Sequence, residues 1–175
     1  PFQYLVNSSM ANITDVEIIT LNCQGLRNPD HRDTLFAWLQ CCKVDILCLQ
    51  ETHAISEQEM NSWLSSATAG GLNTRGYRCF SSLGANRSCG VAILYLPKFD
   101  LINWSRDRAG CELSHEDHNL QICNVYGPNR AKEGCLFFES LGQFIEADTP
   151  VVFCGDFNTV VDPQLDRFGC NPNSP

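Results

Sequence analysis

Short apolar segments alternate with amphipathic segments along the first part of the chain. Val16 to Leu21 is β-branched and apolar and runs into a polar, glycine-containing stretch, which is typical of a buried strand that ends in a loop. After Pro29, apolar side chains recur at helical spacing and predict a helix, and Asp45 to Leu49 predicts a second buried strand. A capping box, Ser56-x-x-Glu59, predicts that the next helix begins at Ser56. This order of strand and helix indicates an α/β fold.

The second half of the chain adds further predicted strands and one helix. Strand-like composition marks the segments Tyr77 to Ser81, Gly90 to Tyr95, Leu101 to Trp104 and Leu120 to Tyr126. One apolar helical face is formed by Phe137, Leu141, Phe144 and Ile145. Val151 to Cys154 follows as another buried strand and runs into Gly155-Asp156-Phe157-Asn158. No repeat and no long linker interrupts this pattern, so a single domain is expected.

Polar residues gather where the predicted strands end. The sequence places Asn22, Glu51, Asp156 and Asn158 at such ends, where the loops of layered α/β folds present ligand-binding side chains. Carboxylates and amides suit a hard cation such as Mg²⁺. Each of these residues also has an ordinary structural explanation. Asn22 is explained by a helix cap, Glu51 by a solvated strand end, and Asp156 with Asn158 by a local turn. Tyr126 is explained by a core or edge aromatic. Solvated side chains are expected for His31, His53, His115 and His118.

Composition and charge limit the classes of protein to which the chain can belong. With 43% hydrophobic and 18% charged residues among 175, the chain is typical of one compact domain. Its 20 acidic and 12 basic side chains give a formal charge of -8, which disfavours tight nonspecific binding of nucleic acid. No apolar stretch approaches the roughly 20 residues of a membrane-spanning helix, and no secretory signal is visible. We therefore expect no membrane partner and a nuclear or cytoplasmic protein that is not secreted.

The cysteines suggest structural thiols. There are 11 of them, an odd number, and none has the CxxC spacing of a zinc site. Apolar strand-like segments contain Cys23, Cys48, Cys123 and Cys154, and there a thiol behaves as a small buried hydrophobe. Free, buried cysteines are therefore expected.

Five motifs follow one another along the chain. They are Thr20-Leu21-Asn22-Cys23-Gln24-Gly25-Leu26, Asp45-Ile46-Leu47-Cys48-Leu49-Gln50-Glu51-Thr52-His53, Gly90-Val91-Ala92-Ile93-Leu94, Asn124-Val125-Tyr126-Gly127-Pro128-Asn129 and Gly155-Asp156-Phe157-Asn158. In this order they resemble the motifs of the endonuclease/exonuclease/phosphatase superfamily. The segments Arg32 to Trp63 and Asp162 to Arg167 are similar to the apurinic-type endonuclease domain of non-LTR retrotransposon polyproteins. The resemblance covers Val16 to Arg167.

This resemblance implies an α/β four-layer sandwich of two β-sheets flanked by helices, with one active site at the strand ends. It also implies Mg²⁺-dependent phosphodiester cleavage, with Mn²⁺ as an alternative ion, DNA as the substrate and no obligate protein partner. The roles that it carries over are metal binding by Glu51 and Asn22, orientation of the attacking water by Asp156, phosphate contact by Asn158 and charge stabilisation by Tyr126.

Two departures from the family pattern bear on activity. Family members continue to a Ser-Asp-His motif, whereas this sequence ends before one, so a sandwich incomplete at the C-terminus and an impaired site are expected. The stretch from Gly110 to His118 looks short of strand residues, which leaves the packing of the middle sheet open. The expected organisation is a tail over 1–15, a truncated domain over 16–168 and a tail over 169–175.

Three functions stay open on the sequence. The leading one is a Mg²⁺-dependent DNA endonuclease domain of retrotransposon origin with weakened activity. The others are a noncatalytic remnant of such a domain and a phosphomonoesterase of the same superfamily, although the sequence Leu165-Asp166-Arg167 favours nucleic acid over lipid. The leading function requires the Glu51 carboxylate to lie within about 6 Å of Asn22 or Asp156, so that one ion can bridge them.

Overall fold

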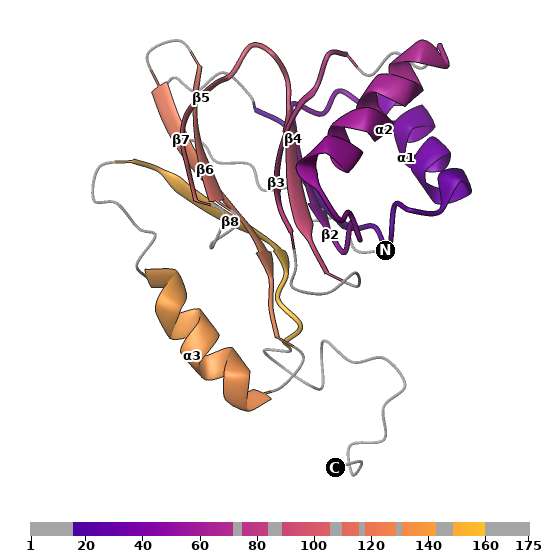
Figure 1. Ribbon diagram of the computed structural model, residues 1–175. Coiled ribbons are helices and arrows are strands. Elements are labelled where there is room, and N and C mark those ends of the chain that lie inside the picture. The colour runs from indigo at the N-terminus through magenta and orange to yellow at the C-terminus, as the bar shows by residue number, and fades with distance from the viewer. Residues whose placement is uncertain are drawn as a thin grey trace.

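In the part of the chain that the structure describes, two four-stranded β-sheets face each other (Figure 1). The computed structural model describes residues 16–71, 75–83, 89–105, 110–115, 118–128, 131–142 and 149–159. The first sheet has the strand order β1 (Ile18–Asn22), β2 (Ile46–Gln50), β4 (Val91–Tyr95) and β3 (Arg78–Ser82). The second has the order β5 (Asp100–Ser105), β6 (Gly110–His115), β7 (His118–Tyr126) and β8 (Val151–Asp156). Both sheets are mixed, because β1 is parallel to β2 and β7 is parallel to β8 while the other pairs are antiparallel.

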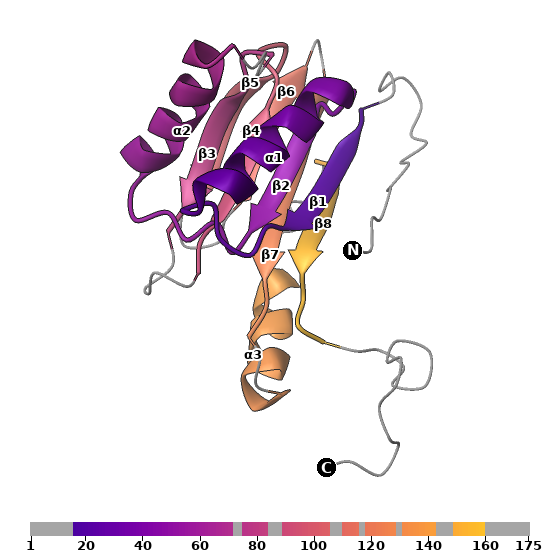
Figure 2. The same cartoon turned by 90° about the vertical axis from the view of Figure 1, so that its right-hand side faces the viewer.

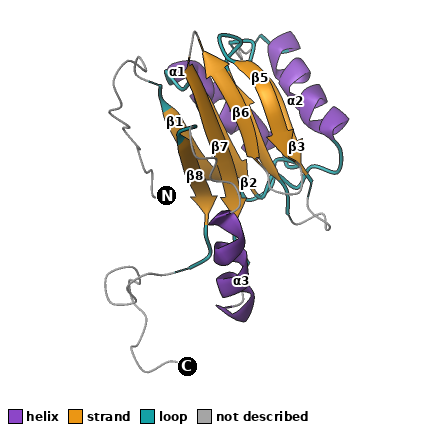
Figure 3. Ribbon diagram, turned by 90° about the vertical axis from the view of Figure 1, so that its left-hand side faces the viewer, coloured by secondary structure: helices purple, strands orange, loops and turns teal. Residues whose placement is uncertain are grey.

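Helices flank these sheets. The outer face of the first sheet is covered by α1 (Pro29–Cys41) and α2 (Glu57–Ala69), as Figure 2 shows. In sequence α3 (Ala131–Leu141) lies between β7 and β8, and it extends beyond the ends of those strands (Figure 3). None of the helices in the described part of the chain is long and apolar enough to cross a membrane. The predicted α/β fold of two sheets with flanking helices is confirmed.

The capping box predicted at Ser56 is present in the structure. The Glu59 backbone N–H donates to Ser56 Oγ at 3.0 Å, and Glu59 Oε2 accepts from the Ile55 backbone N–H at 2.8 Å. The first bond satisfies a backbone donor that the first turn of α2 would otherwise leave without a partner, and the second ties Glu59 to the residue before the cap. They fix the start of α2 and, with it, the loop that connects α2 to the end of β2.

Strand β2 lies at the centre of the first sheet and is covered on both faces. Every one of its residues, Ile46 to Gln50, is at most 1% exposed. One face packs on the helices and the other faces the second sheet, so the strand is apolar throughout instead of alternating. The exception is Gln50, whose polar side chain is buried at the end of the strand.

The stretch from Gly110 to His118 departs from the expectation. It contains a full strand, β6, which pairs with β7 in unbroken antiparallel register from Gly110 opposite Cys123 to His115 opposite His118. Cys111 and Leu113 supply its buried positions, while Glu112, Ser114 and His115 are polar. The structure thus answers the question that the sequence left open: two apolar side chains at alternate positions are enough for a strand that is covered on one face.

Candidate active site

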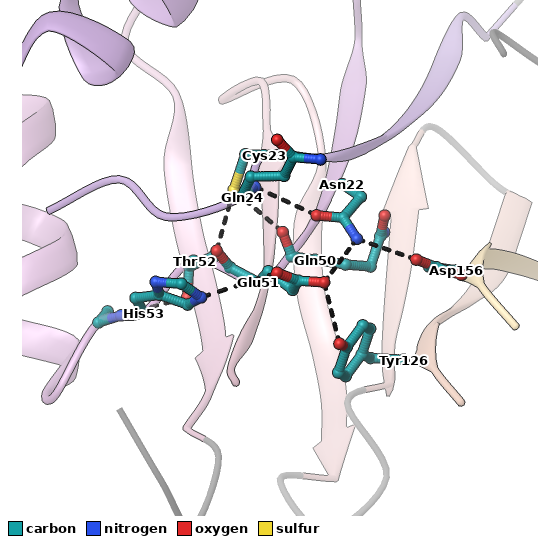
Figure 4. A network of polar contacts seen from close by, with 10 residues as sticks. Asn22, Cys23, Gln24, Gln50, Glu51, Thr52, His53, Tyr126 and Asp156 are labelled. Carbon is teal, nitrogen blue, oxygen red and sulfur yellow. Dashed lines mark hydrogen bonds and ion pairs between the residues drawn. The ribbon is translucent and has the colours of Figure 1, made fainter. Parts of the chain in front are cut away.

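Alternate side chains of four strands point into the space between the two sheets, and each series starts apolar and ends polar. The inward-facing residues are Ile18, Thr20 and Asn22 on β1, Ile46, Cys48 and Gln50 on β2, Leu120, Ile122, Asn124 and Tyr126 on β7, and Val152, Cys154 and Asp156 on β8. The polar ends meet at one edge of the sheets (Figure 4). The fold therefore gathers residues from distant parts of the sequence into a single cluster.

Asn22, the last residue of β1, lies at the centre of this cluster. Its Nδ2 donates to Glu51 Oε1 at 2.8 Å and to Asp156 Oδ2 at 2.9 Å. Its Oδ1 accepts from the Gln24 backbone N–H at 3.1 Å, which fixes the orientation of the amide. The predicted proximity of Glu51 to Asn22 is thus observed. Because the nitrogen and not the oxygen of Asn22 faces the carboxylates, its predicted role as a metal ligand stays a prediction.

Glu51 follows β2 directly, in a left-handed backbone conformation with φ of 54°. The loop after β1 is bound to this segment by backbone hydrogen bonds, among them Gly25 N–H to Glu51 O at 2.8 Å. The next residue, Thr52, donates its N–H to Gly90 O at 3.0 Å. These bonds support an unusual conformation at Glu51 from both sides. The carboxylate is therefore held in one place by its backbone as well as by Asn22.

Tyr126, the last residue of β7, brings a phenol from the second sheet to the same carboxylate. Its hydroxyl donates to Glu51 Oε1 at 2.9 Å. Partial burial, followed by this hydrogen bond, raises the pKa of Tyr126 above its ordinary value of 10.0. The phenol is therefore a neutral hydrogen-bond donor near pH 7, which is the form that can stabilise negative charge.

Asp156 ends β8 and is positioned by a glycine. A Cβ atom at Gly155 would lie 1.9 Å from the Val125 carbonyl oxygen, so only glycine allows β8 to approach β7 this closely. Asp156 Oδ1 accepts from the Asn158 backbone N–H at 3.0 Å. The Asn158 side chain donates to Gly127 O at 2.7 Å, and it also hydrogen-bonds the side chain of Tyr126. The structure thus brings all five predicted site residues together.

His53 was expected to be solvated, and this was wrong. Its Nε2 lies 3.8 Å from Glu51 Oε2, and its side chain is 28% exposed. Gly25 makes room for the imidazole, since a Cβ there would lie 2.6 Å from His53 Nδ1. The only available signal in the sequence was its place two residues after Glu51. His115 is also partly buried, with its ring 5.3 Å from that of Phe99, while His31 and His118 are exposed as expected.

The donor set of the cluster fits a Mg²⁺ ion. Glu51 and Asp156 each present a carboxylate oxygen to the same amide nitrogen, at 2.8 and 2.9 Å, so the two carboxylates converge on one place at the strand ends. In the residues that the structure describes, no group of three or more His, Cys, Asp or Glu side chains could hold an ion. Mg²⁺ needs only one or two protein carboxylates, because water and phosphate oxygens complete its octahedral shell. An all-oxygen set with few carboxylates is therefore compatible with this ion.

The structure is that of an α/β domain with two facing mixed sheets and a cluster of carboxylates at their strand ends. The model of the endonuclease/exonuclease/phosphatase family matches residues 19–173, and the chain belongs to this family. It is 30% identical over 158 residues to the transposon TX1 uncharacterized 149 kDa protein of Xenopus laevis, covering 85% of this chain. The resemblance to retrotransposon proteins is thereby confirmed. The chain spans 11% of the length of that relative.

Solved structures share the fold. TDP2 from Caenorhabditis elegans superposes with a TM-score of 0.61 at 17% identity, over 83% of this chain and 48% of that one. An AP endonuclease from Archaeoglobus fulgidus has a TM-score of 0.61 at 22% identity, over 85% of this chain and 60% of that one. TDP2 of D. rerio, complexed with a single-strand DNA product, has a TM-score of 0.61 at 17% identity, over 85% of this chain and 62% of that one.

Proposed function

We propose that the chain is a Mg²⁺-dependent phosphodiester hydrolase that acts on DNA, an endonuclease domain of retrotransposon origin. One observation carries the proposal: Asn22, Glu51, Tyr126 and Asp156, from both sheets, form one hydrogen-bonded cluster at the strand ends. The transposon relative and the DNA complex of the structural neighbour TDP2 support a nucleic-acid substrate.

Each residue of the site has its own proposed role in hydrolysis. Asp156 orients a water molecule and accepts its proton while the water oxygen bonds to phosphorus. The P–O ester bond breaks, and its electron pair leaves with the ester oxygen, which takes up a proton from water. Asn158 contacts the phosphate, and the Tyr126 hydroxyl stabilises negative charge on the phosphoryl oxygens. Glu51 and Asn22 would hold the ion, Asn22 through its side-chain oxygen, while Asn22 Nδ2 keeps Glu51 and Asp156 in register. When bound, Mg²⁺ would supply neutralisation of the charge that develops on the phosphate.

The acidic character of the chain affects how it would bind DNA. With a formal charge of -8, it offers little general attraction for a phosphate backbone. A bound divalent cation offsets part of this repulsion at the site itself. We therefore expect weak binding of DNA without the ion and low nicking rates. Weak nuclease activity therefore stays a prediction, and a measured nicking rate tests it.

Nicking of supercoiled plasmid by the purified chain tests the proposal. Relaxed circles should accumulate with Mg²⁺ and should not accumulate with a chelator. Glu51→Ala should abolish the activity, because it removes a carboxylate from the proposed ion site. Glu139→Ala is the matched control, since Glu139 is an exposed glutamate on α3, and it should nick at the parental rate.

The other outcomes argue against the proposal. Nicking that persists in the chelator or in Glu51→Ala would place the activity elsewhere or in a contaminant. A folded chain that leaves the plasmid intact after prolonged incubation would favour a noncatalytic domain. Release of phosphate from an inositol phospholipid without plasmid nicking would favour a phosphomonoesterase.

A further inference from the structure

Two primary amides are buried directly beneath the candidate site, one on each sheet. Gln50 ends β2 and is 1% exposed, and Asn124 lies on β7 and is fully buried. Gln50 Nε2 donates to Asn124 Oδ1 at 2.6 Å, across the space between the sheets. Gln50 precedes Glu51, and Asn124 lies two residues before Tyr126, on the same side of β7. The bond between the amides therefore lies one step below the bond between Tyr126 and Glu51.

Further partners hold both amides in place. Gln50 Nε2 also lies 3.0 Å from Thr20 Oγ1 on β1 and 3.2 Å from the carbonyl oxygen of Cys48. Asn124 Nδ2 donates to the carbonyl oxygens of Leu49 on β2 and Ala92 on β4, both at 2.9 Å. A single residue of the second sheet is thus bonded to two neighbouring strands of the first. Buried donors without partners are costly, so this set of contacts strongly disfavours any other spacing of the sheets here.

The layer of side chains below this pair consists of thiols and aliphatic groups instead of amides. Deeper between the sheets the facing residues include Cys48, Ile122, Leu113 and Cys154, which are thiols and aliphatic side chains. Apolar burial is not directional, and packed sheets tolerate small shifts as long as volume is conserved. Hydrogen bonds fix both distance and angle. Close to the site, it is therefore the amide pair, more than the apolar core, that sets how the sheets are aligned.

We propose that the Gln50–Asn124 pair is the positioning contact that aligns the two halves of the site, Glu51 on the first sheet and Tyr126 with Asp156 on the second. The inference rests on the proposed function, because it assigns to a buried pair the task of keeping Glu51, which would hold the ion, in range of Tyr126 and Asp156 on the other sheet. Neither residue touches the substrate or the ion. Both act through the strands that carry the site residues.

The double variant Gln50→Leu/Asn124→Leu tests this role. Replacing both amides with apolar groups of similar size leaves neither amide without its partner, so the cost is limited to the donors lost at the other acceptors, such as the carbonyl oxygens of Leu49 and Ala92. The variant should therefore fold, and it should bind Mn²⁺, used alone as a probe, about 10-fold more weakly than the parent, in the range typical for residues that support metal ligands. A matched control is Ile122→Val, one layer deeper on β7, which should lower stability without changing Mn²⁺ affinity.

A second readout needs no metal. The carbon-13 signal of the Tyr126 ring at neutral pH reports its hydrogen bond to Glu51, and Tyr126→Phe identifies the signal. In the double variant the signal should shift in the same direction as in Glu51→Gln, and in Ile122→Val it should stay where it is in the parent. If the parent binds no Mn²⁺, the proposed function fails while this readout still decides whether the pair positions Tyr126.

Two results would overturn the inference. A folded double variant with parental Mn²⁺ affinity and an unmoved Tyr126 signal would show that the pair only fills space. Should the double variant not fold, Asn124→Ser is used instead, because the shorter serine side chain cannot reach Gln50 but stays polar. Its Mn²⁺ affinity and its Tyr126 signal are measured in the same way. An equal loss of affinity in Ile122→Val would reduce the effect to general destabilisation and would overturn the assignment.

Discussion

Asn22 and Asp156 lie 134 positions apart in the sequence and are joined by a hydrogen bond of 2.9 Å from Nδ2 to Oδ2. The bond connects β1 and β8, which belong to different sheets and stand last in the order of the described strands. Because the same nitrogen also binds Glu51 Oε1, one amide lies between two carboxylates that would otherwise repel each other. The site is thus held together by a donor from a residue that carries no charge.

Asn22→Leu should lower the free energy of unfolding by about 2 kcal/mol, because two part-buried carboxylates lose a shared donor while the side-chain shape is nearly kept. Urea unfolding measures the change. Asn61→Ala, an exposed position on α2, should stay within about 0.5 kcal/mol of the parent. Equal stability of Asn22→Leu and the parent would show that the two bonds add nothing to the fold.

Gly155→Ala should lower stability by about 3 kcal/mol, because the new Cβ would lie against the Val125 carbonyl oxygen and the backbone has a φ of +137°. The strain should also displace Asp156, so affinity for Mn²⁺ should fall as well. Gly142→Ala offers a comparison, since nothing lies within 4 Å of its Cβ position. Thermal unfolding of the two variants side by side should separate them, and similar midpoints would contradict the close approach of β8 to β7.

Ser56→Ala should cost about 1 kcal/mol, the usual value for a lost helix cap. Only α2 and its entry depend on this side chain, through the 3.0 Å bond to Glu59 N–H. Mn²⁺ affinity should therefore be unchanged. A variant as stable as the parent in guanidinium unfolding would mean that the capping box adds nothing to stability.

Stability should fall in alkaline solution because of the buried thiols. Burial raises the pKa of Cys23, Cys79 and Cys111 from 9.0 to about 12. In the unfolded chain these thiols lose their protons near pH 9.0, while in the folded chain they keep them, so the folded state binds more protons above that pH. The stabilisation is therefore present in full below about pH 9 and is lost as the pH rises toward about 12.

Urea unfolding in a reducing buffer at several pH values measures this slope. Cys111→Val removes one buried thiol while keeping an apolar side chain, so its stability should decline less steeply with pH. Cys41→Ala, at an exposed position, should keep the parental slope. Identical slopes for all three proteins would argue against a contribution from buried thiols.

Local features of the fold were predictable from the sequence. The apolar run before Gln50 predicted a buried central strand, and Ser56 with Glu59 predicted the start of a helix, because both signals depend on neighbouring residues only. The strand at Gly110 to His115 was missed, since its polar alternate positions resemble a loop. Its pairing with β7 becomes apparent only once the register between the two strands is known.

The residues of the site could be predicted from the sequence, but those of its contacts that depend on the fold could not. Strand ends and motif order pointed to Asn22, Glu51, Tyr126, Asp156 and Asn158, and the structure brings them together. The place of His53 depends on positive backbone φ angles at His53 itself and at Glu51, which composition does not reveal. The bond between Gln50 and Asn124 depends on the alignment of two sheets, which no pattern within one strand encodes.

Anomalous diffraction from crystals of the chain soaked in Mn²⁺ tests the central claim most directly, because it locates the ion. Mn²⁺ favours the same carboxylate and water ligands as Mg²⁺. We predict one strong peak, at about 2.2 Å from a Glu51 carboxylate oxygen and adjacent to Asp156, and no such peak in crystals of Glu51→Gln. A peak that persists in Glu51→Gln, or parent crystals without a peak between these two carboxylates at saturating Mn²⁺, would contradict the assignment of this cluster as a metal-dependent active site.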